Sequence, residues 1–392
     1  MKDELLDLYS EYLICSFGQA TATGLEAVMD GAVSHDQISR ALNSKKRTAA
    51  DYWQIVKPTI RKMQSADGVM IVDDTIAEKP YSDENDIVCW HYDHTSGQTI
   101  KGIGLVTTLY VSNGMALPAE YRLIAKTEMY VDKKDGKTKR RSPVSKNELY
   151  RQMLLQTKIN QIPFKYVLND IWFASAENMN YVKHDLKKEF VMPLKTNGPW
   201  PLEGPLSEGH FRNVALSADD KRQGIYVRVD EVEIEANTVR RVYLEGVSFP
   251  LLLAKQVFHN KDGSIGVLYL VTSDLTLTYE SGPPLGHGII SLYQKRWTKV
   301  ALLGAIAARP PGEPFHKSLK QNAALERSPA HTVKTQTNHI FASLCAFITY
   351  GSVIYFADFP ESKMQSNVGG WSENRKHRSR LFGWMKHRCC LP

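Results

Sequence analysis

Carboxylates follow two apolar segments that are far apart in the sequence. Asp73 and Asp74 come directly after the apolar run Val69–Val72, and Asp170 follows the apolar segment of "FKYVLND". Acids at the ends of neighbouring strands can converge on one point at the edge of a mixed sheet. Carboxylate oxygens are hard ligands that suit Mg²⁺ or Mn²⁺. Two such ions about 3.5–4 Å apart would support in-line phosphoryl transfer. The pattern alone is weak evidence, because any strand can end in Asp.

The elements that position these acids have different periodicities along the chain. Residues 1 to about 65 are typical of helices: Ser34 and Gln37 make a capping box, and Thr48 caps a second amphipathic helix after a basic turn. These helices either present a helix to DNA or simply cap the next domain. From residue 67 the pattern predicts strands, including a hairpin over residues 102–124 around Ser-Asn-Gly. A lysine-rich loop follows over residues 126–146, solvated or in contact with phosphates.

Further along, the period-two alternation returns. The segments "IYVRVDEVEIEA", "RRVYLEGV" and "GSIGVLYLVTSD" predict a run of antiparallel strands. Helical patterns resume at "HGIISLYQKRW" and "EPFHKSLKQNAALER". The predicted organisation is a helical DNA-binding region over 1–66, a catalytic α/β domain in two parts over 67–189 and 276–350, a β-rich insertion over 190–275, and an atypical basic tail over 351–392.

Composition limits the class of protein. The net charge is +7, which fits a nucleic-acid partner without proving one. No apolar run reaches the roughly 18 residues of a membrane span, and the acidic N-terminus is not a signal peptide. The five cysteines show no metal or disulfide spacing, which suits a reducing compartment. A cytoplasmic protein without membrane contact is expected.

Together these motifs resemble an insertion-sequence DDE transposase of the RNase H-like superfamily, in the branch with a Tyr-Arg-Glu-Lys signature. That branch carries Asp-Asp-Thr after its first strand, as in Asp73–Thr75, and a second acid after an apolar strand, as in "YVLNDIWF". Its signature, Tyr-x₂-Arg-x₃-Glu-x₆-Lys, is matched by residues at four positions: Tyr293, Arg296, Glu313 and Lys320.

The resemblance implies a fold and a set of roles. The fold is an RNase H-like mixed sheet flanked by helices and interrupted by an all-β insertion, with a helical N-terminal region. Asp74, Asp170 and Glu313 would hold two Mg²⁺ or Mn²⁺ ions, with Asp73 as a supporting or capping partner. Tyr293, Arg296 and Lys320 would grip DNA phosphates. The partners would be terminal inverted repeats and target DNA, the active complex a homodimer, and the location the nucleoid.

The chain departs from the family pattern in two places. Sixteen residues lie between Arg296 and Glu313, thirteen more than the signature has, and they include Pro310 and Pro311, which break a helix. Either this segment loops out and Glu313 docks normally, or the third metal ligand is displaced. The Gly-, Arg- and Trp-rich tail is the other departure, and a degenerate copy of the element would explain both. The alternative function is therefore a catalytically impaired remnant that only binds DNA, and an unrelated RNase H-like nuclease is a third.

One further cluster invites a metal. "WHYDH" offers His91, Asp93 and His94, but no companion ligands are spaced nearby, so a structural role is expected.

Overall fold

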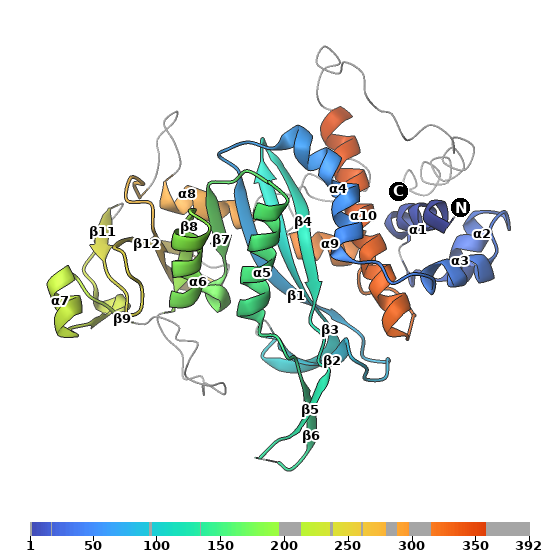
Figure 1. The fold of residues 1–392 in the computed structure, drawn as a ribbon, viewed down its shortest axis with the longest axis horizontal. Helices are drawn as coiled ribbons and strands as arrows, with labels where there is room; N and C mark the ends of the chain where they lie inside the picture. The colour runs from blue at the N-terminus through green and yellow to red at the C-terminus, as the bar shows by residue number, and fades with distance from the viewer. Residues whose placement is uncertain are drawn as a thin grey trace.

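The computed structural model describes residues 2–16, 18–93, 96–133, 135–195, 213–235, 238–259, 262–279, 288–297 and 315–357. Its centre is a nine-stranded mixed sheet in the order β11-β12-β13-β8-β7-β1-β3-β2, with β4 paired to β3. Helices flank this sheet (Figure 1). The mixed α/β class that the sequence predicts is confirmed.

One half of the sheet carries Asp73, Asp74 and Asp170. β1 (Val69–Glu78) runs antiparallel to β3 (Gln98–Ser112) and parallel to β7 (Tyr166–Asn169). β3 then turns through Asn113 and Gly114, both at positive φ, into β4 (Met115–Leu123), as the hairpin prediction requires. On its other side, β3 also pairs with β2 (Val88–Asp93). The apolar first half of β1 is buried, and its second half is partly exposed.

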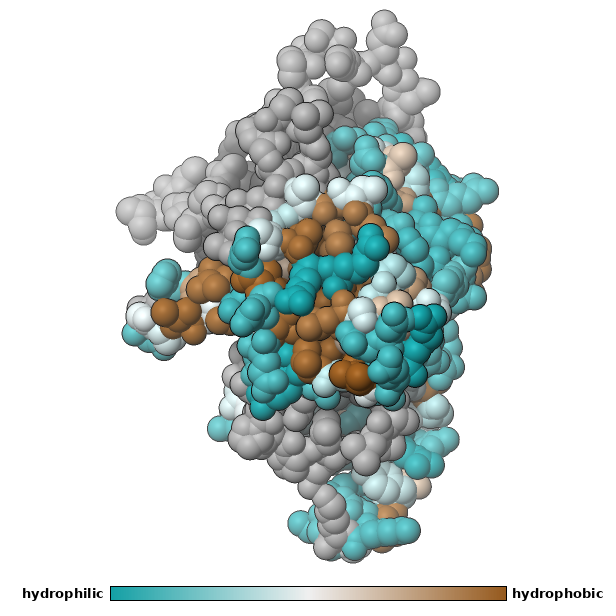
Figure 2. Space-filling view, turned by 90° about the vertical axis from the view of Figure 1, so that its left-hand side faces the viewer, coloured by the Kyte–Doolittle hydropathy of each residue, from teal (hydrophilic) through white to brown (hydrophobic). Residues whose placement is uncertain are grey.

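The other half of the sheet comes from the range predicted as a β-rich insertion. β8 (Glu189–Leu194) pairs parallel to β7, and β13 (Ile265–Thr272) pairs with β8. β12 (Leu251–His259) and β11 (Val239–Val242) complete this side. These strands therefore extend the central sheet. Figure 2, which faces this end of the molecule, shows apolar side chains interrupted by hydrophilic ones.

One strand prediction in this range is wrong. Over the described residues 225–235 of the predicted strand, the structure forms only the two-residue strand β10 (Val227–Arg228), followed by a single turn of 3₁₀ helix over Val229–Glu231. Val229 and Val232 are both buried, so the buried side chains are three residues apart, as a 3₁₀ turn places them. Alternation in the sequence did not distinguish this turn from a strand. β10 pairs with the equally short β9 (Asn213–Val214).

The N-terminal helices pack on the last helix of the described chain. They are α1 (Lys2–Cys15), α2 (Ala22–Val28), α3 (His35–Leu42) and α4 (Ala49–Met63). The predicted capping boxes at Ser34 and Thr48 are both formed. Asn338 of α10 (Val333–Ala357) accepts from Arg47 N and donates to the carbonyls of Leu42 and Lys45. The basic turn thus has its backbone fixed to α10.

The remaining helices cover the sheet around the acids. α5 (Lys146–Ile159) lies against β3 and β4, and Figure 1 shows it crossing one face of the sheet. α6 (Ala176–Asn180) continues into one π-helical turn, η2 (Tyr181–Asp185). The other helices are short: α7 (Ala218–Gln223), α8 (Ile289–Gln294) and α9 (Phe315–Asn322). In the described part of the chain, no helix is both long and apolar enough to cross a membrane.

Candidate active site

The acids of β1 and β7 meet where the pairing of these two strands ends. The two strands are parallel neighbours with Val72 opposite Asn169, so Asp73 and Asp74 lie beside the residue that follows β7. Carboxylate oxygens of Asp73, Asp74 and Asp170 all lie within 4.8 Å of one another. The expectation that the first strand ends at its acids is wrong: β7 ends at Asn169, but β1 continues to Glu78 beside β3, so Asp73 and Asp74 lie within the strand.

The side chain of Asp170 is held by the backbone of the residues that follow it. Its carboxylate caps the short helix η1 (Ile171–Phe173) by accepting from Trp172 N at 3.1 Å. The preceding Asn169 is fully buried and accepts from the hydroxyl of Tyr150 at 3.1 Å. This network fixes the end of β7. Burial, followed by the negative charge of Asp73, raises the pKa of Asp170 to about 7, while Arg296 opposes the rise.

Asp74 faces a lysine from α5. Lys146 Nζ lies 2.7 Å from Asp74 Oδ2, and the same ammonium lies 5.4 Å from the centre of the Trp172 ring. Lys146 is the first residue of α5, directly after the cap Ser145. The ion pair therefore ties the start of α5 to the acid cluster and supplies one positive charge to it.

Asp73 faces two cationic or titratable groups from late in the chain. Arg296 Nη2 lies 3.5 Å from Asp73 Oδ2, and His316 Nδ1 lies 3.8 Å from the same oxygen. His316 also shares a hydrogen bond with Thr107 Oγ1 at 2.9 Å. Burial lowers the pKa of His316, so it is neutral near pH 7, although Asp73 opposes the shift. Asp73 thus lies in the acid cluster as closely as Asp74 does.

Of the four signature residues, the structure brings two to the acids. Tyr293 is buried, and its hydroxyl accepts from Arg296 Nη1 at 2.7 Å, so the tyrosine orients the arginine. Lys320 instead pairs with Glu326 at 2.7 Å, and Glu326 accepts from the backbone of Glu78 at the end of β1. Glu313 lies outside the described residues, as does the extra segment before it.

Sequence reasoning did not single out Lys146, Thr107 or His316 as partners of the acids. Nothing in their local sequence marks them, since each arrives through tertiary packing of a different element. In "WHYDH", His91 is buried, and burial lowers its pKa to about 3, whereas His94 lies outside the described residues. Among the described residues, the metal-competent cluster of three or more ligands is the acidic one, and it contains no histidine.

The donor set fits a hard divalent cation. Three carboxylates close enough to share an ion offer oxygen ligands, which Mg²⁺ and Mn²⁺ prefer over softer metals. A cation at this position would also relieve the repulsion that raises the pKa of Asp170. Arg296 and Lys146 flank the cluster and could neutralise a phosphate held beside it.

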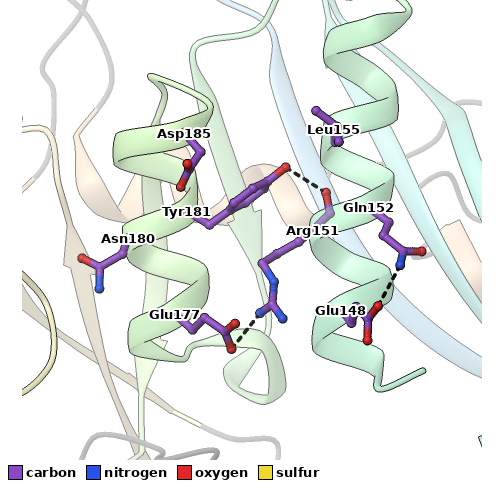
Figure 3. Close-up of a pocket in the computed structure, with 8 residues that line it drawn as sticks. All are labelled: Glu148, Arg151, Gln152, Leu155, Glu177, Asn180, Tyr181 and Asp185. Atoms are coloured by element: carbon purple, nitrogen blue, oxygen red, sulfur yellow. Dashed lines mark hydrogen bonds and ion pairs between the residues drawn. The ribbon is translucent and has the colours of Figure 1, made fainter. Parts of the chain in front are cut away.

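A separate groove lies between α5 and α6–η2. It has a volume of about 510 Å³ and is lined in part by Glu148, Arg151 and Tyr181. In Figure 3, Arg151 reaches toward Glu177, at 3.0 Å, and the Tyr181 hydroxyl donates to the Arg151 carbonyl at 3.2 Å. The three clustered acids do not line it, and its one basic residue, Arg151, pairs with its Glu177. The groove is therefore a packing feature of two helices rather than the centre of chemistry.

Comparison with known protein families identifies the family of this chain. The model of the DDE superfamily endonuclease family matches residues 2–199, just over half of the chain. The chain belongs to the DDE superfamily endonucleases. The match contains Asp73, Asp74 and Asp170 and ends before the Tyr-Arg-Glu-Lys positions. Endonucleases of this family take DNA as their substrate, and the mixed sheet is the RNase H-like fold that the resemblance implies. A search of curated proteins found no match to this chain.

Proposed function

We propose that this DDE superfamily endonuclease is a DNA transposase that cleaves at the ends of its element and then joins the freed 3′-hydroxyl to target DNA. The observation that carries the proposal is the convergence of Asp73, Asp74 and Asp170, with Arg296 and Lys146 pressed against them. Nucleases need anionic ligands for the cation and positive side chains for the phosphate. The three acids supply the ligands, and Arg296 and Lys146 supply the positive charges.

The acids would hold the divalent cations. Asp74 and Asp170 are the proposed ligands, Asp73 lies near enough to join them, and Glu313 is proposed as the third family acid. Bound Mg²⁺ or Mn²⁺ ions, two in all, would activate water or a 3′-hydroxyl and stabilise the leaving oxygen.

The side chains around the acids have separate roles. Arg296 offers a planar fork to a phosphate, and the Tyr293 hydroxyl orients it. Lys320 is proposed to reach a phosphate by leaving Glu326 when DNA binds. Thr107 donates to the backbone carbonyl of Asp73 at 3.4 Å and shares a hydrogen bond with His316, whose Nδ1 lies 3.8 Å from the Asp73 carboxylate. These two residues are proposed to support Asp73 from late and middle parts of the chain.

The finer parts of the proposal concern partners. The DNA would carry terminal inverted repeats, two ends would be held by a homodimer, and the complex would act at the nucleoid. The hydrogen bonds of Asn338 fix the backbone of the turn at residues 43–47, and its exposed Lys46 is proposed to contact DNA. Lys45 in the same turn pairs with Asp51 at 2.8 Å.

A second function is favoured by one feature of the sequence. The thirteen extra residues between Arg296 and Glu313 separate the arginine from the third acid. If they keep Glu313 from the cluster, the protein would bind element ends without cutting them.

A nicking assay separates the two functions. Supercoiled plasmid that carries the matching inverted repeats is incubated with the protein and Mg²⁺ or EDTA. The transposase nicks only with Mg²⁺, and Asp170→Asn lowers the rate by about 100-fold or more, since even outer-shell partners of metal ligands contribute roughly 10–100-fold. The matched control, Asp262→Asn, changes an exposed carboxylate that only caps Ser264 and should nick normally. If the unmodified protein binds the inverted repeats but does not nick the plasmid, the protein is the catalytically impaired remnant.

A further inference from the structure

A two-stranded arm projects from the sheet beside the acid cluster. It consists of residues 128–141, in which β5 (Glu128–Val131) pairs antiparallel with β6 (Thr138–Arg141). Figure 1 shows it extending away from the body of the molecule, below β2 and β3. We propose that this basic arm grips duplex DNA next to the cleavage site, an inference that rests on the proposed function and adds a binding surface to it.

The base of the arm is fixed to the body. Arg140 donates to Asp86 Oδ1 at 3.3 Å and to the carbonyl of Lys126 at 3.4 Å. Arg141 pairs with Glu128 across the two strands at 2.9 Å and lies 5.8 Å from the centre of the Tyr130 ring. A ribbon held this way keeps its direction, so its tip is presented at a set place relative to the sheet.

The charge of the arm is arranged to leave its tip positive. The arm carries six Lys or Arg against three Asp or Glu. Two of the acids, Asp132 and Asp135, both contact Lys139, at 2.5 and 3.1 Å. Lys133 and Lys137 beside them are exposed. The acids are thus engaged within the arm, while these two lysines point into solvent with their charge available.

The arm also lies close to the acids along the chain. Lys137 lies nine positions before Lys146, whose ammonium binds Asp74. An extended chain of nine residues spans at most about 31 Å, which is about one turn of B-DNA. DNA whose scissile phosphate lay at the acids would therefore pass within reach of the tip.

Duplex DNA is the partner that this shape and charge fit. A two-stranded β-ribbon is narrow enough for the major groove, and lysines at its tip can neutralise phosphates on either side. Phosphate contacts of this kind position the duplex without reading its sequence. The arm would hold the flanking duplex while the acids act on one strand.

The test measures binding and its salt dependence. A labelled duplex of about 40 bp and mixed sequence is titrated by fluorescence anisotropy between about 50 and 200 mM salt, in EDTA. The slope of log K against log salt is negative, and each lost phosphate contact makes it less steep by about 0.9. Replacing both tip lysines (K133Q with K137Q) should therefore make the slope less steep by about 2 and weaken binding about 10–50-fold at 100 mM salt.

The matched control is Lys187→Gln. Lys187 is also exposed, but it precedes β8 at the opposite end of the parallel strands from the acids. The Lys187→Gln variant should bind DNA as the unmodified protein does. Thermal melting of both variants verifies that each is folded, and the charge reversal K133E with K137E should weaken binding further.

The outcomes for the arm and for the catalytic proposal are distinct. A wild-type slope and affinity in the double variant overturn the arm, whatever the nicking assay gives. Weakened binding in the double variant by a protein that never nicks supports the arm and overturns the transposase activity. If the control loses as much affinity and slope per removed charge as the tip variant, the arm is overturned, because the effect would then follow net charge alone.

Discussion

The three clustered carboxylates should make the metal-free protein less stable than a variant with one of them removed. The test substitution is Asp170→Asn. Asparagine keeps an oxygen that can accept from Trp172 N, so the cap of η1 survives. The substitution removes the negative charge and little else. Its effect therefore reports the cost of the buried charge together with the repulsion among the acids.

The magnitude follows from the pKa of Asp170. Its value of about 7 in the folded protein, against an ordinary 3.8, reflects burial first and the charge of Asp73 next. At about 1.36 kcal/mol for each pH unit, the ionised group opposes folding by at most about 4 kcal/mol at pH 8. Water and counterions at the partly exposed site screen some of this, so we expect Asp170→Asn to raise the free energy of unfolding by about 1–3 kcal/mol.

The stability gained by Asp170→Asn should depend on pH, because it comes from the ionised carboxylate of Asp170. The pKa of Asp170 is raised on folding, so its favourable contribution is complete below pH 3.8 and is lost as the pH rises through about 7. At pH 5 the native carboxyl is already mostly protonated, so much of the advantage of the asparagine variant disappears. The gain should be largest at pH 8.

The assay is urea denaturation at pH 5 and pH 8, with EDTA or Mg²⁺. Mg²⁺ should stabilise the unmodified protein through binding to the folded state, and it should have little effect on Asp170→Asn. Asp262→Asn serves as the control, since its carboxylate lies in an exposed turn. The reasoning is refuted if Asp170→Asn is destabilised at pH 8 in EDTA, or if its gain is the same at both pH values.

Three further predictions concern single features. Burial lowers the pKa of His339 to about 3, so its contribution to the free energy of unfolding is present above pH 6.5 and is lost on acidification. The loss of stability between pH 7 and pH 5, measured by urea denaturation, should be about 2 kcal/mol smaller in His339→Gln than in the unmodified protein. The same loss in both proteins would contradict this prediction. Lys146→Met removes a cation that competes for Asp74, so half-saturation by Mg²⁺ in thermal shift assays should occur at roughly 3–10-fold lower concentration, and weaker binding would argue against the ion pair. Deleting the thirteen extra residues between Arg296 and Glu313 should restore or raise nicking, and no change would indicate that the segment is harmless.

Local sequence determined the features that depend on near neighbours. The capping boxes at Ser34 and Thr48 and the Asn-Gly hairpin between β3 and β4 form as predicted, because each is closed by residues within a few positions of one another. Apolar runs that end in Asp marked β1 and β7 for the same reason. Alternation failed in residues 225–235, where the buried Val229 and Val232 are three positions apart, as a 3₁₀ turn requires, and not two apart as in a strand.

Only the tertiary structure decided what surrounds the acids. That β7 lies beside β1 follows from the order of strands in the sheet, and this adjacency brings Asp170 to Asp73 and Asp74. Lys146 and Arg296 reach the cluster from elements that start 68 or more residues away along the chain from β1. Charge–charge interactions depend on distance in space, and a sequence records distance along the chain. The residue types that could bind a metal were therefore readable in advance, whereas the cations that balance them were not.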